Sequence, residues 1–347
     1  MEAKALYMRR ALELAELAIG RTAPNPMVGA VLVDRRTGQI AGEGYHHKAG
    51  EPHAEVMAIR QAEGQNLREC RLYVTLEPCS HHGKTPPCAD LIIDKGIPEV
   101  IVAMQDPFPQ VAGQGIDRLR RHGVYVEVGL LRDEAEYLNR GFLSSVLKHR
   151  PYITLKWAET ADGFIDYQRQ SSRQQPLLLS GARQQRFVHK LRAEHDGILI
   201  GGRTLRLDDP RLNNRLWIGP SPRPIVLSHS ANIPTESYLH SQAKEAKAYG
   251  RPSILICSET AEPSKTELLE QGGWELIRYA GDRAPLQEIL ARLCERRIQS
   301  LLVEGGSEVL NSFIQADLYD HIERERSHLR IGQGIQAPLY PPSNSAP

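Results

Sequence analysis

The stretches GEPHAEV (residues 50–56) and LEPCSHHGKTPPCADL (76–91) decide how this chain is interpreted, because together they combine one histidine with two cysteines. His53, Cys79 and Cys88 supply an imidazole and two thiolates, which leaves the fourth tetrahedral position of a zinc ion open for water. An open position is typical of catalytic zinc, which makes hydroxide available near neutral pH. The two stretches therefore predict one catalytic zinc ion per chain.

Glu55 follows His53 by two positions and is predicted to be a general acid/base rather than a ligand. Hydrolytic deamination needs a group that takes a proton from water and delivers one to the departing ammonia. Residues two apart do not share a face of a regular helix, so we expect both in the first turn of a helix that Pro52 starts. A second helix start at Pro87 favours the thiolate form of Cys88. This division of labour is the pattern of zinc deaminases.

The composition is that of an ordinary globular protein. Its 347 residues suggest two domains of about 150 residues each. The 43 Lys and Arg against 42 Asp and Glu leave a formal charge of +1, which gives no electrostatic reason to expect nucleic acid or a membrane as partner. The first twenty residues carry three glutamates within an amphipathic pattern, so they predict neither a signal peptide nor a membrane span. We expect a cytoplasmic protein.

Hydrophobic periodicity predicts that strands alternate with helices in both halves, which favours mostly parallel sheets covered on both faces. Pro151 biases its predecessor away from helix, so we place the first domain at 1–148 and the second at 149–347. We expect residues 229–250 to be polar and rich in turns. The first half is predicted to contain helices at 4–19, from 52, from 87, at 114–122 and at 132–148, and strands at 28–34, 39–45, 71–77, 99–104 and 124–129. The second is predicted to contain strands at 152–158, 197–202, 223–228, 253–258 and 300–306, and helices at 182–195 and 285–297.

Two glycine pairs, Gly201-Gly202 and Gly305-Gly306, follow apolar strands in the second half. Glycine there lets a phosphate approach the backbone, although the same pattern is also a common structural turn. The chain has no Gly-x-Gly-x-x-Gly fingerprint, so a standard dinucleotide fold is not expected.

The first half closely resembles the deaminase domain of the bifunctional riboflavin-biosynthesis pyrimidine deaminase/reductases. The stretches that carry the resemblance are NPMVGAVLV (25–33), GYHHKAGEPHAE (44–55) and TLEPCSHHGKTPPC (75–88). The insertion of residues 80–87 between the cysteines, where other deaminases have Pro-Cys-x-x-Cys, points to this subfamily. In the second half the resemblance rests on TLKWAETADG (154–163), ILIGGRTLRLDDPRLNNR (198–215) and LLVEGGSEVLNSF (301–313).

The resemblance covers essentially the whole chain and implies a cytidine-deaminase-like three-layer α/β/α domain followed by a dihydrofolate-reductase-like α/β domain. It implies zinc-dependent deamination of a diaminohydroxyphosphoribosylaminopyrimidine, followed by NADPH-dependent reduction of its ribosyl group to ribityl. The substrate-binding residues that it implies are Asn25, His46, His81 and Lys84 in the first domain and Arg192, Arg211, Leu212, Arg215 and Glu304 in the second. The implied cofactor-binding residues are Ala158, Thr204, Asp208, Gly306 and Ser307.

Three places depart from the family pattern. Leu178 stands where a tryptophan commonly lies beside the cofactor, and Phe164 stands where a basic residue is usual. The stretch 321–334 is strongly charged where a more apolar strand is expected.

Two other functions stay open at this point. The first is a cytidine- or nucleic-acid-type deaminase with an unrelated second domain, although the near-zero net charge and the lack of a basic, aromatic-rich stretch argue against a nucleic-acid substrate. The second is a non-catalytic binding module in which zinc only stabilises the fold. The expected partner is a small phosphoribosylaminopyrimidine, with no nucleic acid and no membrane, and a homo-oligomer stays open.

Overall fold

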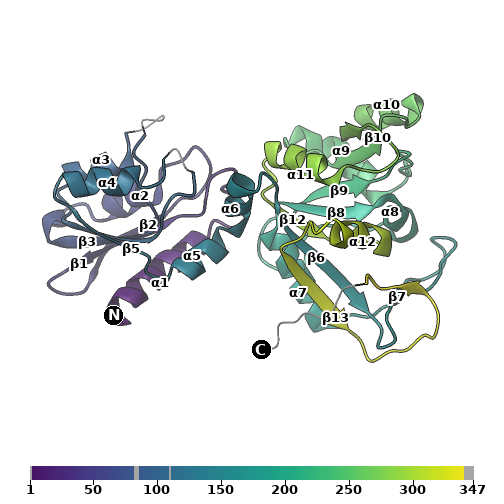
Figure 1. The fold of residues 1–347 in the computed structure, drawn as a ribbon, viewed down its shortest axis with the longest axis horizontal. Coiled ribbons are helices and arrows are strands. Elements are labelled where there is room, and N and C mark those ends of the chain that lie inside the picture. The colour runs from purple at the N-terminus through teal and green to yellow at the C-terminus, as the bar shows by residue number, and fades with distance from the viewer. Residues whose placement is uncertain (1, 82–85, 109–110, 340–347) are drawn as a thin grey trace. The chain divides into compact units, whose positions relative to one another are not determined.

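The computed structural model describes residues 2–81, 86–108 and 111–339. The chain separates into two compact units, Met1–His149 and Arg150–Pro347, and each contains its own β-sheet (Figure 1).

The first unit contains a five-stranded sheet in the order β2-β1-β3-β4-β5. Strand β1 is antiparallel to β2 and β3, whereas β3, β4 and β5 are parallel. The expected mostly parallel arrangement is therefore wrong at β1. The few residues that join β1 to β2 allow only an antiparallel pair between those two strands. The strands are β1 (Gly29–Asp34), β2 (Ile40–Tyr45), β3 (Cys70–Leu76), β4 (Glu99–Met104) and β5 (Tyr125–Val128).

Helices cover both faces of this sheet, as alternation along β1 requires. Ala30 and Leu32 face a core formed with α2, α3 and α4, whereas Val31 and Val33 face a core formed with α1 and α5. The result is the three-layer α/β/α arrangement (Figure 1). The helices are α1 (Glu2–Glu16), α2 (Ala54–Gln61), α3 (Cys88–Asp94), α4 (Gln114–Arg121), α5 (Arg132–Leu138) and α6 (Arg140–Leu147), with a short 3₁₀ turn η1 (Leu67–Glu69).

The single helix expected over 132–148 is wrong, because the structure divides it into α5 and α6 at Asn139. The buried Asn139 side chain accepts a hydrogen bond from the Met27 N–H at 2.8 Å and donates one to the Met27 carbonyl at 3.0 Å. This tertiary contact ties the helix break to the segment that contains Asn25.

The second unit contains a seven-stranded sheet, β11-β10-β9-β8-β12-β6-β13, in which all neighbours are parallel. A separate antiparallel pair joins β7 to β14. The strands of this unit are β6 (Tyr152–Glu159), β7 (Phe164–Asp166), β8 (Gly197–Gly201), β9 (Arg223–Leu227), β10 (Ile254–Ser258), β11 (Glu275–Tyr279), β12 (Ser300–Val303), β13 (His321–Arg326) and β14 (Ile335–Gln336).

Helices also cover both faces of the second sheet. Leu199 of β8 faces a core shared with α11 and α12, whereas Ile198 and Ile200 face a core shared with α7 to α10. The helices are α7 (Ala182–Glu194), α8 (Gly202–Asp208), α9 (Tyr238–Ala248), α10 (Pro263–Gln271), α11 (Leu286–Glu295) and α12 (Ser307–Gln315).

Two expectations for the second unit need correction. Residues 229–250 are not only turns, because α9 lies there with Leu239 and Ala243 buried and the Ser237 hydroxyl accepting from the His240 N–H. The charged stretch 321–334 still contains a strand, β13, which pairs with β6. Arg324 of β13 forms an ion pair with Glu159 of β6 at 2.5 Å.

Candidate active sites

The three predicted metal ligands lie together in the first unit. His53 caps the N-terminus of α2, Cys79 follows β3, and Cys88 is the first residue of α3. The His53 Nδ1 atom lies 3.6 Å from the Cys79 Sγ and 3.4 Å from the Cys88 Sγ. Zinc bonds of about 2.1 Å to nitrogen and about 2.3 Å to sulfur, at tetrahedral angles, place these atoms roughly 3.6 Å apart. The donor set therefore fits one zinc ion.

The surroundings of Cys79 favour its thiolate. Hydrogen bonds with the Cys88 thiol and the His53 ring, and one from the Cys88 backbone N–H at 3.3 Å, lower the pKa of Cys79 to about 4. The contact with Cys79 also raises the pKa of His53. The contact between Cys88 and Cys79, together with burial, raises the pKa of Cys88, because two adjacent thiolates would repel each other. A cation between the sulfurs removes that repulsion, which suits the pair to metal binding.

Glu55 lies beside the metal ligands and is only 3% exposed. Burial raises its pKa to about 7, so the carboxyl group can both accept and donate a proton near neutral pH. The helix begins at Ala54, so His53 occupies the cap position rather than the first turn that we expected. Glu55 is in the first turn, as predicted.

Asn25 and His46 contact each other next to the metal site. The Asn25 Nδ2 atom lies 3.1 Å from the His46 Nε2, and the His46 Nδ1 lies 3.1 Å from the Pro52 carbonyl. Burial lowers the pKa of His46, and these two contacts fit the neutral ring protonated on Nδ1. The His46 and His53 rings meet edge to face at 5.5 Å. His81 is exposed, and Lys84 lies outside the described residues.

Sequence reasoning missed Glu77, although it lies within the quoted Thr-Leu-Glu-Pro-Cys motif. Its buried carboxylate accepts four backbone N–H bonds, from residues 106, 113, 115 and 116, at 2.8 to 3.3 Å. A Cβ atom at Gly115 would lie 1.9 Å from the Pro78 carbonyl oxygen, so only glycine fits there. Glu77 thus holds this chain segment against the residue before Cys79.

In the second unit a cavity of about 1810 Å³ opens at the carboxyl ends of the parallel strands. This is where open α/β sheets bind ligands. Gly201, Leu227 and Tyr279 line the cavity from the ends of β8, β9 and β11. Of the predicted cofactor residues, Thr204, Gly306 and Ser307 line it, whereas Ala158 and Asp208 do not.

Two of the predicted substrate residues, Arg192 and Glu304, form an ion pair. The guanidinium donates to both carboxylate oxygens of Glu304, at 3.0 and 2.6 Å, and to the Asn213 carbonyl at 3.2 Å. Asn213 lies between the other predicted residues, of which Leu212 is buried and Arg215 is exposed with its N–H bonded to the His189 ring. Arg211 instead lies over the Tyr238 ring, at 5.3 Å.

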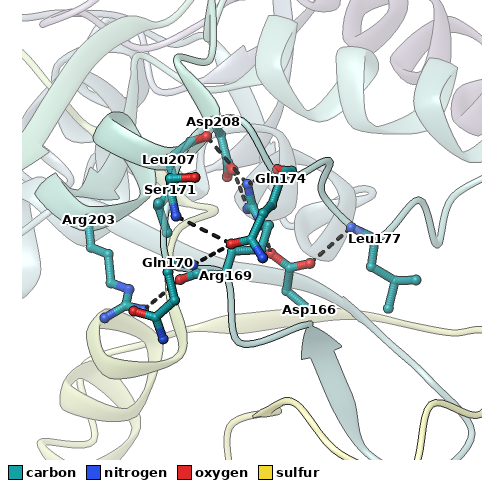
Figure 2. Close-up of polar contacts among 9 residues, drawn as sticks. All are labelled: Asp166, Arg169, Gln170, Ser171, Gln174, Leu177, Arg203, Leu207 and Asp208. Atoms are coloured by element: carbon teal, nitrogen blue, oxygen red, sulfur yellow. Dashed lines mark hydrogen bonds and ion pairs between the residues drawn. The ribbon is translucent and has the colours of Figure 1, made fainter.

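Asp208 is engaged by a residue that sequence reasoning also missed. Arg169, which is 4% exposed, forms ion pairs with Asp208 and with Asp166 (Figure 2). No local pattern signals this contact, because Arg169 lies in an irregular segment far from Asp208 in the sequence.

The two single-residue departures from the family pattern lie at the surface or near it. Leu178 is 78% exposed, and Phe164 is a half-buried residue of β7.

Within 2–81, 86–108 and 111–339, the His53, Cys79 and Cys88 group is the one cluster of three or more such side chains that could hold a metal ion. None of the helices described there combines the length and the apolar character that a bilayer crossing demands.

Both units of the chain match families of known proteins. Residues 1–104 match the model for the cytidine and deoxycytidylate deaminase zinc-binding region, and residues 151–324 match the RibD C-terminal domain. The riboflavin biosynthesis protein RibD of Aquifex aeolicus is 41% identical over 95% of this chain and 88% of its own length. The Escherichia coli protein of that name is 38% identical over 91% and 85%.

Solved structures agree along nearly the whole chain. An Acinetobacter baumannii RibD structure superposes with a TM-score of 0.84 at 30% identity, covering 99% of this chain and 92% of its own. A diaminohydroxyphosphoribosylaminopyrimidine deaminase/5-amino-6-(5-phosphoribosylamino)uracil reductase from Thermotoga maritima superposes with a TM-score of 0.81 at 34% identity, covering 99% and 93%.

Proposed function

The chain belongs to the RibD family of riboflavin biosynthesis proteins, and on that premise we propose how its residues divide the work of two reactions. The enzyme is bifunctional. It deaminates a diaminohydroxyphosphoribosylaminopyrimidine with zinc and then reduces the ribosyl group to ribityl with NADPH.

In the deaminase, His53, Cys79 and Cys88 hold zinc, which when bound activates a water molecule for attack on the pyrimidine. Glu55 takes a proton from that water and returns a proton to the departing amine. Its burial beside the ligands supports this role, because a carboxyl group with a pKa of about 7 exchanges protons at neutral pH.

Asn25 and His46 bind the pyrimidine at this site. Their mutual contact supports the assignment, since it fixes an amide and a neutral imidazole next to the metal ligands. We assign His81 and Lys84, in the insertion between the cysteines, to the same substrate, because they match family positions that contact the base and its ribose phosphate.

In the reductase, NADPH occupies the cavity at the strand ends, with Thr204, Gly306 and Ser307 against it. Ala158 and Asp208 do not line the cavity, and we assign them to the cofactor site from the family pattern. Asp208 forms an ion pair with Arg169, whose sequence neighbours Gln168 and Gln170 line the cavity. The guanidinium groups of the substrate site suit a phosphate, which they bind through two oxygens at once. The substrate residues are Arg192, Arg211, Leu212, Arg215 and Glu304.

The main support for this assignment is that the metal site and the cavity lie in different units of the chain. The metal ligands and Glu55 lie in one compact unit, whereas the cavity is lined entirely by residues of the other. We place the boundary between the two domains between residues 148 and 149. We also propose that the enzyme is cytoplasmic.

Separate inactivation of the two reactions tests the assignment. Removal of zinc by a chelator should abolish deamination and spare reduction of the already deaminated compound, because hydride transfer from a nicotinamide requires no metal. Arg215→Ala should impair reduction and leave deamination unchanged. If either treatment stopped both reactions in a folded protein, the two-site assignment would be wrong.

A further inference from the structure

A buried arginine organises the segment 166–177 of the second unit (Figure 2). The Arg169 Nε donates to Asp166 at 2.6 Å, its Nη2 donates to Asp208, and its Nη1 donates to the carbonyls of Gln174 and Leu207 at 3.4 and 3.3 Å. One side chain therefore ties two parts of the segment to the C-terminal end of α8.

Further contacts fold the segment on itself. The Gln174 side-chain oxygen accepts from the N–H groups of Gln170 and Ser171, and the second oxygen of Asp166 accepts from the Leu177 N–H at 2.9 Å. Figure 2 shows these groups converging around the Arg169 side chain. Residues 167–177, which form neither helix nor strand, thereby acquire a defined shape.

The same segment borders the cavity assigned to NADPH. Gln168 and Gln170, on either side of Arg169 in the sequence, are exposed and line that cavity. Arg203 of α8 also lines it, and its Nη2 donates to the Arg169 carbonyl at 3.4 Å. Arg203 has no carboxylate within ion-pair distance among the described residues, so its charge is available to a ligand.

We propose that Arg169 is a positioning residue of the reductase, which holds Gln168, Gln170 and Arg203 as one wall of the cofactor cavity. Because an unpaired guanidinium at a cavity wall favours an anion, this wall faces a phosphate of the dinucleotide. The inference rests on the proposed binding of NADPH in this cavity.

Arg169→Gln tests the positioning role in the full-length enzyme, because glutamine cannot reach both carboxylates. We expect the KM for NADPH to rise roughly tenfold, while kcat at saturating NADPH and the KM for the deaminated substrate stay within about twofold. Arg169→Lys should lie between the two, since lysine keeps the charge but lacks the planar fork. Titration with NADPH alone should show the same order of affinities.

Arg223→Gln is the matched control. Arg223 is also a buried arginine and pairs with Glu275. It is the first residue of β9, so it lies at the amino-terminal end of the strand, whereas the cavity opens at the carboxyl ends. The Arg223→Gln variant should lower the melting temperature about as much as Arg169→Gln does. It should leave the KM for NADPH unchanged.

A double variant Gln168→Ala/Gln170→Ala covers the case in which Arg169→Gln does not fold. Both side chains are exposed, so the melting temperature should not change while the KM for NADPH rises several-fold. An unchanged KM in this variant or in folded Arg169→Gln overturns the inference, as does a fall in kcat with both KM values raised together. Failure of the wild type to use NADPH would instead overturn the proposed function.

Discussion

The Nδ1 atom of His53 lies 3.4 Å from the Sγ of Cys88, although 35 positions separate the two residues in the chain. The parallel strands β3 and β4 and the helices α2 and α3 bring them together, with Cys79 completing the group.

Cys88→Ser should reduce bound zinc well below the one ion per chain expected for the wild type. A neutral hydroxyl is a much poorer zinc ligand than a thiolate, and deamination should fall with the metal content. Metal analysis of both proteins, purified side by side, measures the change. Unchanged zinc content would exclude Cys88 as a ligand.

Glu55→Gln should keep its zinc and lose deamination by at least roughly a hundredfold, because general acid/base catalysis contributes about 10²–10⁴ in rate. Substrate affinity should change far less, since the loss falls on the transition state. Single-turnover deamination and metal analysis on the same preparation check this. Loss of zinc together with activity would make Glu55 a ligand.

Glu77→Ala should destabilise the first unit by roughly 3 kcal/mol, because four backbone N–H groups lose their buried acceptor. Deamination should fall with it, since the held segment lies against the residue before Cys79. Urea unfolding of the variant and the wild type, both at full length, measures the stability. Glu13→Ala, on the exposed face of α1, is the control and should change neither quantity.

Much of the first site was predictable because its chemistry lies in short motifs. His53, Glu55, Cys79 and Cys88 have a recognisable spacing, and each sits at a helix start or strand end that proline or periodicity marks. Asn139 was not predictable as a helix break, because its partner Met27 is distant in sequence. Most strand positions followed from their apolar runs.

The second site was less visible in the sequence. Helix α9 was missed because only Leu239 and Ala243 are buried in it, so its apolar periodicity is weak. Arg169 resembles any polar loop residue until residues 166–177 meet the end of α8. Such contacts depend on the tertiary fold rather than on local pattern.

Glu304→Gln should destabilise the second unit at neutral pH by about 3 kcal/mol, because it leaves the largely buried Arg192 guanidinium without its carboxylate partner. Burial opposes the charge of Glu304, but Arg192 outweighs it and holds the pKa below the usual value. The stabilisation is therefore present at neutral pH and is lost as pH falls from about 4.3 through the folded-state pKa. Urea unfolding of both proteins across this range should show the difference shrinking, and a constant difference would contradict the ion pair.

The most direct test of the whole account is mass analysis of the products formed from the diaminohydroxyphosphoribosylaminopyrimidine. Without NADPH, the account predicts a single product in which one amine is replaced by oxygen taken from isotopically labelled water. With NADPH, it predicts the same product carrying two further hydrogens, with one equivalent of cofactor oxidised. Recovery of unchanged substrate under both conditions, or reduction without prior deamination by the zinc-loaded protein, would contradict it.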